Sequence, residues 1–495
     1  MRTHGICRAT LIFAVASALV AVPARAVDWP NYRGVNHDGK TTETVPSWPP
    51  VESWSVDIGA GFSSVAVVGG YVYTEGWSDG QNTVWCLDES DGSVVWSFSY
   101  ACSYADSGYR GSRATPTVHN GFVYTFSQDG HLYRFNATTG AETLIDTISS
   151  GEPGWGFASS PLIEGNLVIV NAYGNAGVAY DLTSLSKVWP ASASNGAGHA
   201  SPVAFTWNAQ RYVAIFAGSR LAGVDPSNGT VLFTYPWAGT STNAADPIPS
   251  GDTIFISTGY GQGCEMLNLG SGTLTSAWYK GGAEAADGVR LKENCAVLDG
   301  GHLYGVNDGG TLRCVAWSDG ITAWSRSGFG TEGSVILTGS GLLVVSNTSN
   351  QLAWVEASAA AYNELGARLS TGMSGNMYTS AVLSNGQIYL RGNASPGILK
   401  CYTFFVDSDS DGIDDIWEVT YFGDLTTADG TSDTDGDGTS DLQEYQDGTN
   451  PLVDEGASDG DAAGLSCVAG GGGAVSLGLL VLVGLVALLQ APKHP

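Results

Sequence analysis

Positive charge is scarce in this chain of 495 residues. Lysine and arginine together number 20 against 48 aspartates and glutamates, which gives a net charge of −28. Nucleic-acid phosphates need clustered Lys and Arg, so this balance excludes a nucleic-acid-binding class, and we expect no nucleic-acid partner. Charged residues make up only 14% of the chain, whereas 68 Gly, 15 Trp and 21 Tyr indicate tight turns and aromatic-rich strands rather than helices.

Cysteine patterns that mark a cofactor are also missing. The 8 Cys form no C-x-x-C-H haem attachment motif, no C-x-x-C zinc or redox pair, and no adjacent pair. Cys7 belongs to the leader described below and Cys467 to the tail. In an exported protein the other six could form up to three disulfides, and the sequence does not choose among the fifteen connectivities. These six are Cys86, Cys102, Cys264, Cys295, Cys314 and Cys401.

Both ends of the chain carry features of export. Arg2 and Arg8 precede an apolar run at 9–22, and an A-x-A cleavage pattern ends at Ala26, so residues 1–26 are expected to be a signal peptide. An uncleaved anchor is the alternative. Near the other end, a Gly-rich linker at 456–473 leads to an apolar stretch at 474–490, which is at the short limit of a membrane span. We expect this stretch to be a hydrophobic helix.

The tail has a resemblance of its own. Cys467, the glycine run at 470–473 and the terminal apolar stretch resemble bacterial C-terminal sorting tails, which are cut and anchored at the cell surface. That pattern usually ends in several arginines, and here there is only Lys493, so a plain tail anchor is the alternative. Either interpretation predicts an exported protein of the cell envelope or surface, held in the membrane by its C-terminal segment.

Eight copies of one phrase fill most of the chain between these ends. Each copy has a small or proline residue, a few apolar residues, a turn and a β-rich run, and the copies recur every 39 to 51 residues. A period of roughly 40–50 residues predicts a solenoid or a propeller. The first copy, residues 62–100, reads as four short antiparallel strands, which is one propeller blade. The anchors of the eight copies are Val65, Pro116, Pro161, Pro202, Pro247, Ala296, Val335 and Ala381.

The sequence therefore predicts an all-β, eight-bladed β-propeller with four-stranded antiparallel blades over residues 27–405. The last copy offers only three strands before residue 405, whereas the strand around 51–59 has no partner of its own. We expect this N-terminal strand to complete the last blade, because such closure removes the exposed sheet edges that invite aggregation.

The second half of each copy repeats an Asp, a turn Gly and an aromatic residue, as from Asp88 to Trp96 and from Asp225 to Phe233. We interpret these residues as structural, because every blade needs them and a single active site does not. The strings CLDESDGSVVW and GVDPSNGTVLF resemble the A-x-D-x-x-T-G-x-x-x-W signature of PQQ-like β-propeller repeats, and the resemblance covers about residues 28–405. This family includes quinoprotein dehydrogenases, an outer-membrane assembly scaffold and many proteins of unknown role.

The resemblance implies the fold more strongly than an activity. The dehydrogenases bind a quinone over the central funnel and have a disulfide between adjacent cysteines, acidic and Asn ligands for Ca²⁺, a catalytic Asp and long capping insertions. This chain lacks the adjacent cysteines and the insertions, so we expect no bound PQQ. A binding or scaffold module is the favoured function. A PQQ-dependent, quinoprotein-like oxidoreductase is the alternative, and a hydrolase or lyase that uses the funnel mouth is a third possibility.

A ligand site is expected where the chain enters each inner strand, because these positions should surround one end of the propeller axis. The side chains there include a cation, an imidazole, two carboxylates and aromatic rings, which suit a polar ligand or a peptide loop. Ordinary solvated loop ends are the alternative, and we assign no catalytic residue. The candidates are Phe62, Arg113, Trp155, Phe157, His199, Glu293, Glu332 and Tyr378.

The composition changes abruptly after Cys401. From Asp407 to Asp461 there are 18 acidic residues and no Lys or Arg. Residues 407–418 and 433–444 each match D-x-D-x-D-G-x₅-E, whose carboxylates and position-7 carbonyl provide the hard oxygens that Ca²⁺ prefers. We expect two Ca²⁺ sites. The expected ligands are Asp407, Asp409, Asp411, Ile413, Asp415 and Glu418 in the first loop, and Asp433, Asp435, Asp437, Thr439, Asp441 and Glu444 in the second.

The flanks of these loops are short. The strings IWEVTYFG and LQEYQDGTNP resemble thrombospondin type 3 or dockerin-like repeats of exported bacterial proteins, which implies a calcium-stiffened spacer over residues 406–455. Together these features predict an exported, monomeric propeller on a calcium-rigidified stalk, whose partner is a protein or polysaccharide of the cell envelope.

Overall fold

The structure, a computed structural model, describes residues 27–453 except 46–47, 103–108, 150–151, 174–175, 190–195, 238–241, 271–272, 283–285, 405 and 448. The chain divides into two compact units between Val406 and Asp407. The expected signal peptide, linker and apolar tail lie outside the described residues. Within the described part, no helix has both the length and the apolar character needed to cross a membrane.

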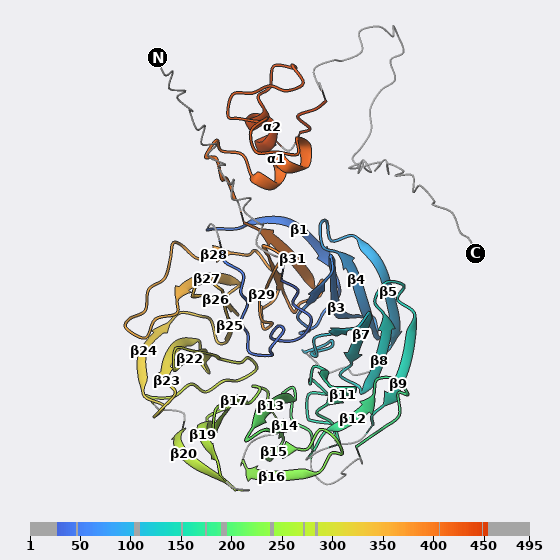
Figure 1. Cartoon of the computed structure of the whole chain (residues 1–495), viewed down its shortest axis with the longest axis vertical. Coiled ribbons are helices and arrows are strands. Elements are labelled where there is room, and N and C mark those ends of the chain that lie inside the picture. The colour runs from blue at the N-terminus through green and yellow to red at the C-terminus, as the bar shows by residue number, and fades with distance from the viewer. Residues whose placement is uncertain are drawn as a thin grey trace, which may run out of the picture. The chain divides into compact units, whose positions relative to one another are not determined.

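The first unit is the expected all-β, eight-bladed propeller, in which antiparallel sheets are arranged around a central axis (Figure 1). Seven sheets have four strands and one has three in the part of the chain described here. In the three-stranded blade, a single bridge between Tyr180 and Lys187 stands where the other blades have a fourth strand. The repeated phrase therefore corresponds to one blade, as its period predicts.

Each blade is built outward from a short inner strand, which follows its anchor residue in seven blades and contains the anchor Val335 in the blade that begins with β25. The inner strands are β2 (Ala66–Val68), β6 (Thr117–His119), β10 (Leu162–Glu164), β13 (Val203–Trp207), β17 (Ile248–Ser250), β21 (Val297–Asp299), β25 (Gly333–Leu337) and β29 (Val382–Ser384). The second strands are β3 (Tyr71–Ser78), β7 (Phe122–Phe126), β11 (Leu167–Val170), β14 (Gln210–Ala217), β18 (Thr253–Thr258), β22 (His302–Asn307), β26 (Leu342–Asn347) and β30 (Gln387–Arg391). The second strands are almost wholly buried because both their faces pack against neighbouring blades.

The third and fourth strands complete the blades. The third strands are β4 (Gln81–Asp88), β8 (His131–Asn136), β12 (Val178–Asp181), β15 (Arg220–Val224), β19 (Gly263–Leu269), β23 (Thr311–Ala316), β27 (Gln351–Glu356) and β31 (Ile398–Thr403). The outer strands are β5 (Val94–Ala101), β9 (Glu142–Thr147), β16 (Val231–Pro236), β20 (Leu274–Gly281), β24 (Thr322–Ser327), β28 (Leu369–Ser370) and, in the last blade, β1 (Val51–Asp57).

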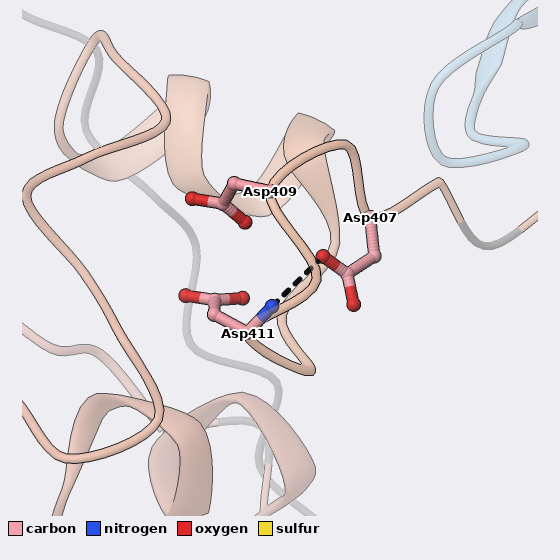
Figure 2. Close-up of side chains that lie close together, drawn as sticks. All are labelled: Asp407, Asp409 and Asp411. Atoms are coloured by element: carbon pink, nitrogen blue, oxygen red, sulfur yellow. Dashed lines mark hydrogen bonds between the residues drawn. The ribbon is translucent and has the colours of Figure 1, made fainter.

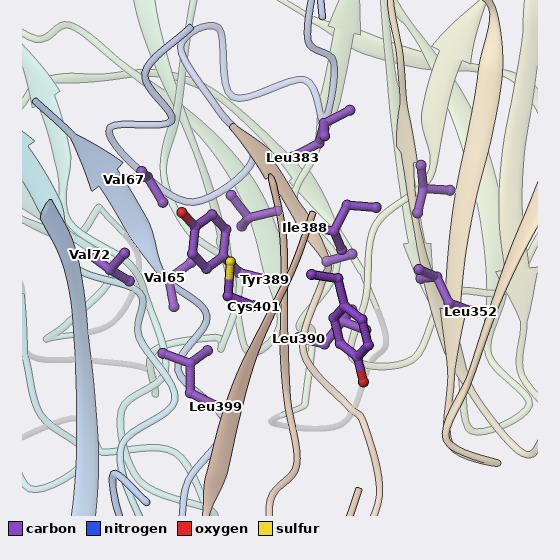
Figure 3. Packing of buried hydrophobic residues seen from close by; sticks show 14 of the residues in the cluster. Val65, Val67, Val72, Leu352, Leu383, Ile388, Tyr389, Leu390, Leu399 and Cys401 are labelled. Carbon is purple, nitrogen blue, oxygen red and sulfur yellow. The ribbon is translucent and has the colours of Figure 1, made fainter. Parts of the chain in front are cut away.

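The ring is closed by the N-terminal strand, as the sequence predicts. Strand β1 pairs antiparallel with β31, so the first strand of the chain is the outer strand of the eighth blade. One buried apolar cluster continues across this junction from β2 and β3 through β30 and β31 to β27 (Figure 3). Burying this surface on both sides of the junction makes the closure part of the core rather than a loose contact.

A tryptophan on the outer strand of one blade packs on the turn glycine of the next blade. The Trp96 ring lies on Gly140, and the Trp96 indole Nε1 donates to the Ala137 carbonyl at 2.9 Å. The same contact joins Trp54 to Gly92, Trp189 to Gly229 and Trp278 to Gly320. The repeated Gly and Trp residues thus join blades, whereas the repeated Asp accepts from its own turn, as Asp88 does from the Ser90 amide at 2.9 Å.

Hydrogen bonds between side chain and backbone also link successive blades near the axis. The Ser64 amide donates to Thr115 Oγ1 at 3.2 Å, the Thr115 amide donates to Ser160 Oγ at 2.9 Å, and the Ser160 amide donates to Ser201 Oγ at 3.1 Å. The series continues to Asp246 and Cys295. These residues all stand directly before an anchor, and we call them the inter-blade belt.

The segment before β1, residues 27–45, forms a strap that the sequence did not predict. It contacts the ends of inner strands in several blades, through Trp29 paired with Val67 and through the Pro30 carbonyl, which accepts from the Val118 amide at 2.7 Å. Farther along, the buried Arg33 donates to the Ala296 carbonyl at 2.8 Å. The strap therefore crosses the propeller axis at the end where inner and second strands are joined.

The six cysteines of the first unit are all buried free thiols, and the expected disulfides are not present among the described residues. Cys86, Cys314 and Cys401 occupy one repeat position, each paired across the sheet with a tyrosine of the second strand. At this position the thiol packs as a small apolar side chain.

The second unit contains two short helices, α1 (Asp415–Tyr421) and α2 (Asp441–Asp447), each preceded by one of the acidic loops. The helices contact each other through Trp417 and Tyr445, whose ring centroids lie 5.6 Å apart. Ile413, which follows the first loop's glycine and precedes α1, is fully buried. A small core thus holds the two loops in one unit.

Candidate functional site

The propeller channel contains a cavity of ≈ 290 Å³. All eight residues that stand three positions before an anchor line this cavity, so each blade contributes one side chain to the same ring. These residues are Phe62, Arg113, Ala158, His199, Ala244, Glu293, Glu332 and Tyr378. We call them the mouth ring.

Seven of the eight candidates for a ligand site from the sequence line this cavity, and one does not. The seven that line it are Phe62, Arg113, Trp155, His199, Glu293, Glu332 and Tyr378. Phe157 instead is buried in the core between blades, with its ring centroid 5.0 Å from that of Phe126. Its neighbour Ala158 takes the position in the ring, because adjacent residues of an extended segment point to opposite sides.

One side of the cavity is aromatic. Trp155 and Tyr109 pack edge to face at 5.3 Å, and Phe62 lies 6.2 Å from Tyr109 and 5.7 Å from Tyr378. These four rings come from the segments that lead into the first, second, third and eighth blades. They form a continuous surface, which we call the aromatic wall.

The opposite side is polar and centres on the segment before β21. The Tyr260 hydroxyl donates to Glu293 Oε1 at 2.7 Å, and Lys292 Nζ pairs with Glu332 Oε1. Lys292 Nζ also lies 4.8 Å from the centroid of the Tyr260 ring. We call Tyr260, Lys292, Glu293 and Glu332 the polar wall.

The two carboxyl groups of the polar wall share their surroundings. Burial, followed by the hydrogen bond and charge of Glu332, raises the pKa of Glu293 well above its ordinary value. Two adjacent buried carboxyl groups cannot both be ionised cheaply, so Glu293 is protonated at neutral pH. With Lys292 paired to Glu332, the polar wall is close to neutral while it still offers donors and acceptors.

Arg113 and His199 support the ring. The Arg113 guanidinium stacks over the Phe62 ring at 5.2 Å and donates to the Tyr109 carbonyl at 2.8 Å, which fixes the segment that carries the aromatic wall. His199 Nε2 donates to the Gly156 carbonyl at 3.1 Å. Burial, with the charge of Arg113 second, lowers the pKa of His199 to about 4, so the imidazole is neutral.

Other residues of the cavity escaped the sequence analysis. Tyr109 and Lys292 lie in the segments between blades, and Tyr260 lies in the turn between β18 and β19 of the fifth blade, where no periodic signal marks them. Tyr32 reaches the cavity from the strap. Four serines that line the cavity could have been found from the sequence, because each directly precedes the anchor of its blade. They are Ser64, Ser160, Ser201 and Ser380.

The first acidic loop gathers three carboxylates. Oxygens of Asp407, Asp409 and Asp411 lie within 4.8 Å of one another (Figure 2). Oxygens bound to one Ca²⁺ at roughly 2.3–2.6 Å are separated by no more than about 5 Å, so this cluster fits the ion. The Asp407 carboxylate also accepts from the amides of Ser410, Asp411 and Gly412, at 2.7, 3.1 and 3.0 Å, which shapes the loop.

The second loop repeats this arrangement. Oxygens of Asp433, Asp435 and Asp437 lie within 4.8 Å of one another, and Asp433 accepts from the amides of Gly436 and Gly438. Gly438 has φ +96° and its counterpart Gly412 has φ +98°, a left-handed region that glycine adopts without strain. The sequence placed glycine at this position for the same sharp turn.

The carboxylate at the ninth position of each loop accepts a hydrogen bond from a backbone amide of its own loop. Asp415 accepts from the Ser408 amide at 2.7 Å, and Asp441 accepts from the Thr434 amide at 3.0 Å. Both carboxylates thus fix the backbone of the second residue of their loop. The position-7 residues, Ile413 and Thr439, donate their amides to Asp411 and Asp437 at 2.8 and 2.6 Å.

Glu418 at the twelfth position is the residue of the first loop whose surroundings fit a bound cation best. Its side chain is fully buried, and neither carboxylate oxygen has a hydrogen-bond partner. Burial and the charges of Asp411, Asp409, Asp415 and Asp407 raise the pKa of Glu418 to about 7. A buried carboxylate without a partner beside three others fits a cation that it would bind through both oxygens. Glu444 holds the equivalent position in the second loop and is also fully buried.

The repeat, the closed ring of blades and the channel cavity define a PQQ-like β-propeller. The family described as outer membrane protein assembly factor BamB matches residues 51–143 and 111–326, more than half of the sequence, and the chain belongs to this family. No protein with curated annotation is similar enough in sequence to count as a relative.

Solved structures with the same fold are distant in sequence. BamB from Moraxella catarrhalis is 14% identical with a TM-score of 0.53, and the match covers 72% of this chain and 100% of that one. Quinohemoprotein alcohol dehydrogenase from Comamonas testosteroni is 14% identical with a TM-score of 0.55, over 81% of this chain and 85% of that one. A europium-containing methanol dehydrogenase is 12% identical with a TM-score of 0.53, over 76% and 98%. At these identities the likeness concerns the fold alone.

Proposed function

We propose that this protein is a binding or scaffold module of the cell envelope, with the mouth ring as its ligand-contacting surface. The observation that carries the proposal is that eight residues at one repeat position, with unlike side chains, surround a single cavity. A repeat position that only maintained the blades would hold similar residues in every blade, as the turn glycines do. Unlike side chains at the position that surrounds the cavity therefore favour recognition.

The chemistry of the cavity favours binding over catalysis. His199 is neutral and donates to a backbone carbonyl, and the Ser160 hydroxyl accepts from the belt, so neither is arranged as a base and its nucleophile. The family's described role in outer-membrane protein assembly supports a scaffold. The likeness to the alcohol dehydrogenases supports a shared fold and adds no residue of a quinone site to this chain.

The second unit serves this function as a spacer that Ca²⁺ stiffens. Each loop brings three aspartates and one buried glutamate around a space where an ion would neutralise their repulsion. Asp407, Asp409, Asp411 and Glu418 would hold one ion, and Asp433, Asp435, Asp437 and Glu444 the other. The leader at 1–26 and the apolar segment at 474–490 support export and attachment to the envelope.

Site-specific photo-crosslinking in the native cell tests the binding proposal. A benzophenone amino acid at Tyr109 or Trp155, both exposed at the mouth, should crosslink the full-length protein to a defined envelope component. The matched control is the same amino acid at Tyr279, an exposed aromatic residue on outer strand β20. Crosslinks from the mouth positions that the control does not give would support the proposal.

Two results would overturn it. One is the absence of any mouth-specific crosslink when the protein is present at its natural abundance. The other is PQQ- and Ca²⁺-dependent reduction of an electron-accepting dye with an alcohol substrate, since turnover would make the protein a quinoprotein-like oxidoreductase rather than a scaffold.

A further inference from the structure

We propose that the channel cavity binds one hydroxyl-rich ring, a terminal sugar residue of a glycan, between the aromatic wall and the polar wall. This inference rests on the proposed binding function and names the chemical class of its ligand. It depends on how the two walls face each other across the mouth ring.

A sugar ring has two kinds of surface that match the two walls. Its faces carry C–H groups, which pack well against aromatic rings, and its edge carries hydroxyl groups, which need donors and acceptors. The aromatic wall provides an exposed platform at Trp155 and Tyr109, which are 38% and 43% exposed. The polar wall lies opposite and provides the hydrogen-bonding groups.

The polar wall offers groups that the ligand can reach. Tyr260 is 45% exposed and the side chain of Lys292 is 23% exposed, whereas Glu293 Oε2 is buried and Glu293 Oε1 accepts from the Tyr260 hydroxyl. Lys292 is a donor with hydrogens beyond those used on Glu332, and the Tyr260 hydroxyl, which Glu293 holds in place, can accept. Buried Glu332 does not reach the ligand; it positions Lys292.

The charge of the polar wall selects against ionic ligands. Lys292 is compensated by Glu332 at the same place, and Glu293 is protonated at neutral pH. Because the charges of Lys292 and Glu332 cancel within the polar wall, this wall offers no uncompensated charge to a cation or to an anion. Hydroxyl groups, which donate and accept without net charge, satisfy such a wall without burying an unpaired charge.

The size of the cavity limits what enters it. A volume of ≈ 290 Å³ is at the lower end of ligand pockets, which are roughly 300–1,000 Å³. The strap crosses the axis at the far end, and its residue Tyr32 lines the cavity. One ring at the end of a glycan fits, with the remainder of the glycan outside the mouth.

Calorimetric titration of the full-length protein tests this assignment. The probes are glucose, galactose, N-acetylglucosamine and the β-1,4-linked trimers of glucose and of N-acetylglucosamine, each at up to tens of millimolar. We expect at least one probe to bind with a Kd of about 1 mM or tighter. Trp155→Ala should weaken it at least about tenfold. Trp207→Ala, which removes an indole from inner strand β13 outside the cavity, should leave it unchanged.

Glu293 provides a second, more specific readout. Glu293→Gln keeps an acceptor for the Tyr260 hydroxyl and should retain binding within about threefold, whereas Glu293→Leu releases that hydroxyl and should weaken binding at least about tenfold. A purely structural role would not separate these two variants once circular dichroism shows both folded. If no probe binds, or if binding is indifferent to Trp155 and Glu293, the sugar assignment is wrong. In that case, mouth-specific crosslinks to a protein would still support the proposed binding function.

Discussion

At the scale of single residues, the contact between a tryptophan and a turn glycine shows why the repeat tolerates so little change. Gly140 has φ +69°, and a Cβ there would lie 2.8 Å from the Trp96 ring. Gly121 has φ +76°, but a Cβ there would meet nothing within 4 Å. A substitution at Gly121 would therefore test backbone strain alone, whereas a substitution at Gly140 would test backbone strain together with the contact between blades.

The first prediction uses this pair. Gly121→Ala should lower the free energy of unfolding by about 1–2 kcal/mol, because only the left-handed conformation is strained. Gly140→Ala should lower it by a further 1–3 kcal/mol or so, because the methyl group also displaces the indole from the next blade. Chemical denaturation of both variants measures the difference. Equal losses would show that the Trp96 contact contributes nothing beyond backbone conformation.

Single residues also show where reasoning from sequence fails. Six cysteines in an exported chain allowed disulfides, but the repeat places Cys86, Cys314 and Cys401 at one position in three different blades. Equivalent positions in different blades are held apart by the ring itself. Aligning the cysteines to the repeat, instead of counting them, would have excluded a disulfide among these three.

At the scale of structural elements, the inter-blade belt explains how blades stay in register around the axis. Thr115 Oγ1 accepts from the buried Ser64 amide, so one hydroxyl joins the inner segments of the first and second blades. The distance in sequence between donor and acceptor is the repeat length, which makes the belt a property of the repeat rather than of one blade.

The second prediction concerns this link. Thr115→Val keeps the shape of the side chain but leaves the Ser64 amide buried without a partner, which should destabilise the propeller by about 1–3 kcal/mol. Thr115→Ser keeps the hydroxyl and should cost less than about 1 kcal/mol. Thermal unfolding followed by near-UV circular dichroism compares the two. A valine variant as stable as the serine variant would rule out a contribution from the belt.

Elements differ in how far the sequence could predict them. The spacing of the eight anchors predicts the blades, the closure by β1 and most of the mouth ring, because these features follow from the positions within a regular repeat. The prediction of Phe157 is wrong by one residue, because Phe157 is buried in the core and Ala158 lines the cavity. The strap has no periodic pattern, and its contacts, such as Arg33 with Ala296, join residues 263 apart, so no local signal could reveal it.

At the scale of the whole molecule, negative charge is concentrated in the second unit. Residues 407–461 hold 18 of the 48 acidic residues and no Lys or Arg, so this short stretch accounts for −18 of the net charge of −28. The propeller has buried apolar clusters in and between its blades, whereas the second unit has two seven-residue helices and a small core. The second unit is therefore the part whose stability should depend on a bound cation.

The third prediction follows from this difference. In full-length protein, Ca²⁺ should raise the unfolding temperature of the second unit, and EGTA should lower it, while the transition of the propeller stays unchanged. Calorimetric titration should show two Ca²⁺ per chain with Kd of about 10⁻⁴–10⁻³ M. Mg²⁺ should not substitute, because it keeps its own waters and demands an octahedral shell.

Glu418 is the residue on which this prediction is tested most cleanly. Asp407 shapes its loop through three amide hydrogen bonds, so its replacement would disturb the fold as well as the ion. Glu418 makes no such bond, and Glu418→Gln should reduce the stoichiometry from two Ca²⁺ to one without unfolding the unit. The control is Asp424→Asn, which alters an acidic residue that caps its own turn outside both loops. Two ions retained in Glu418→Gln, or one lost in Asp424→Asn, would contradict the ligand assignment.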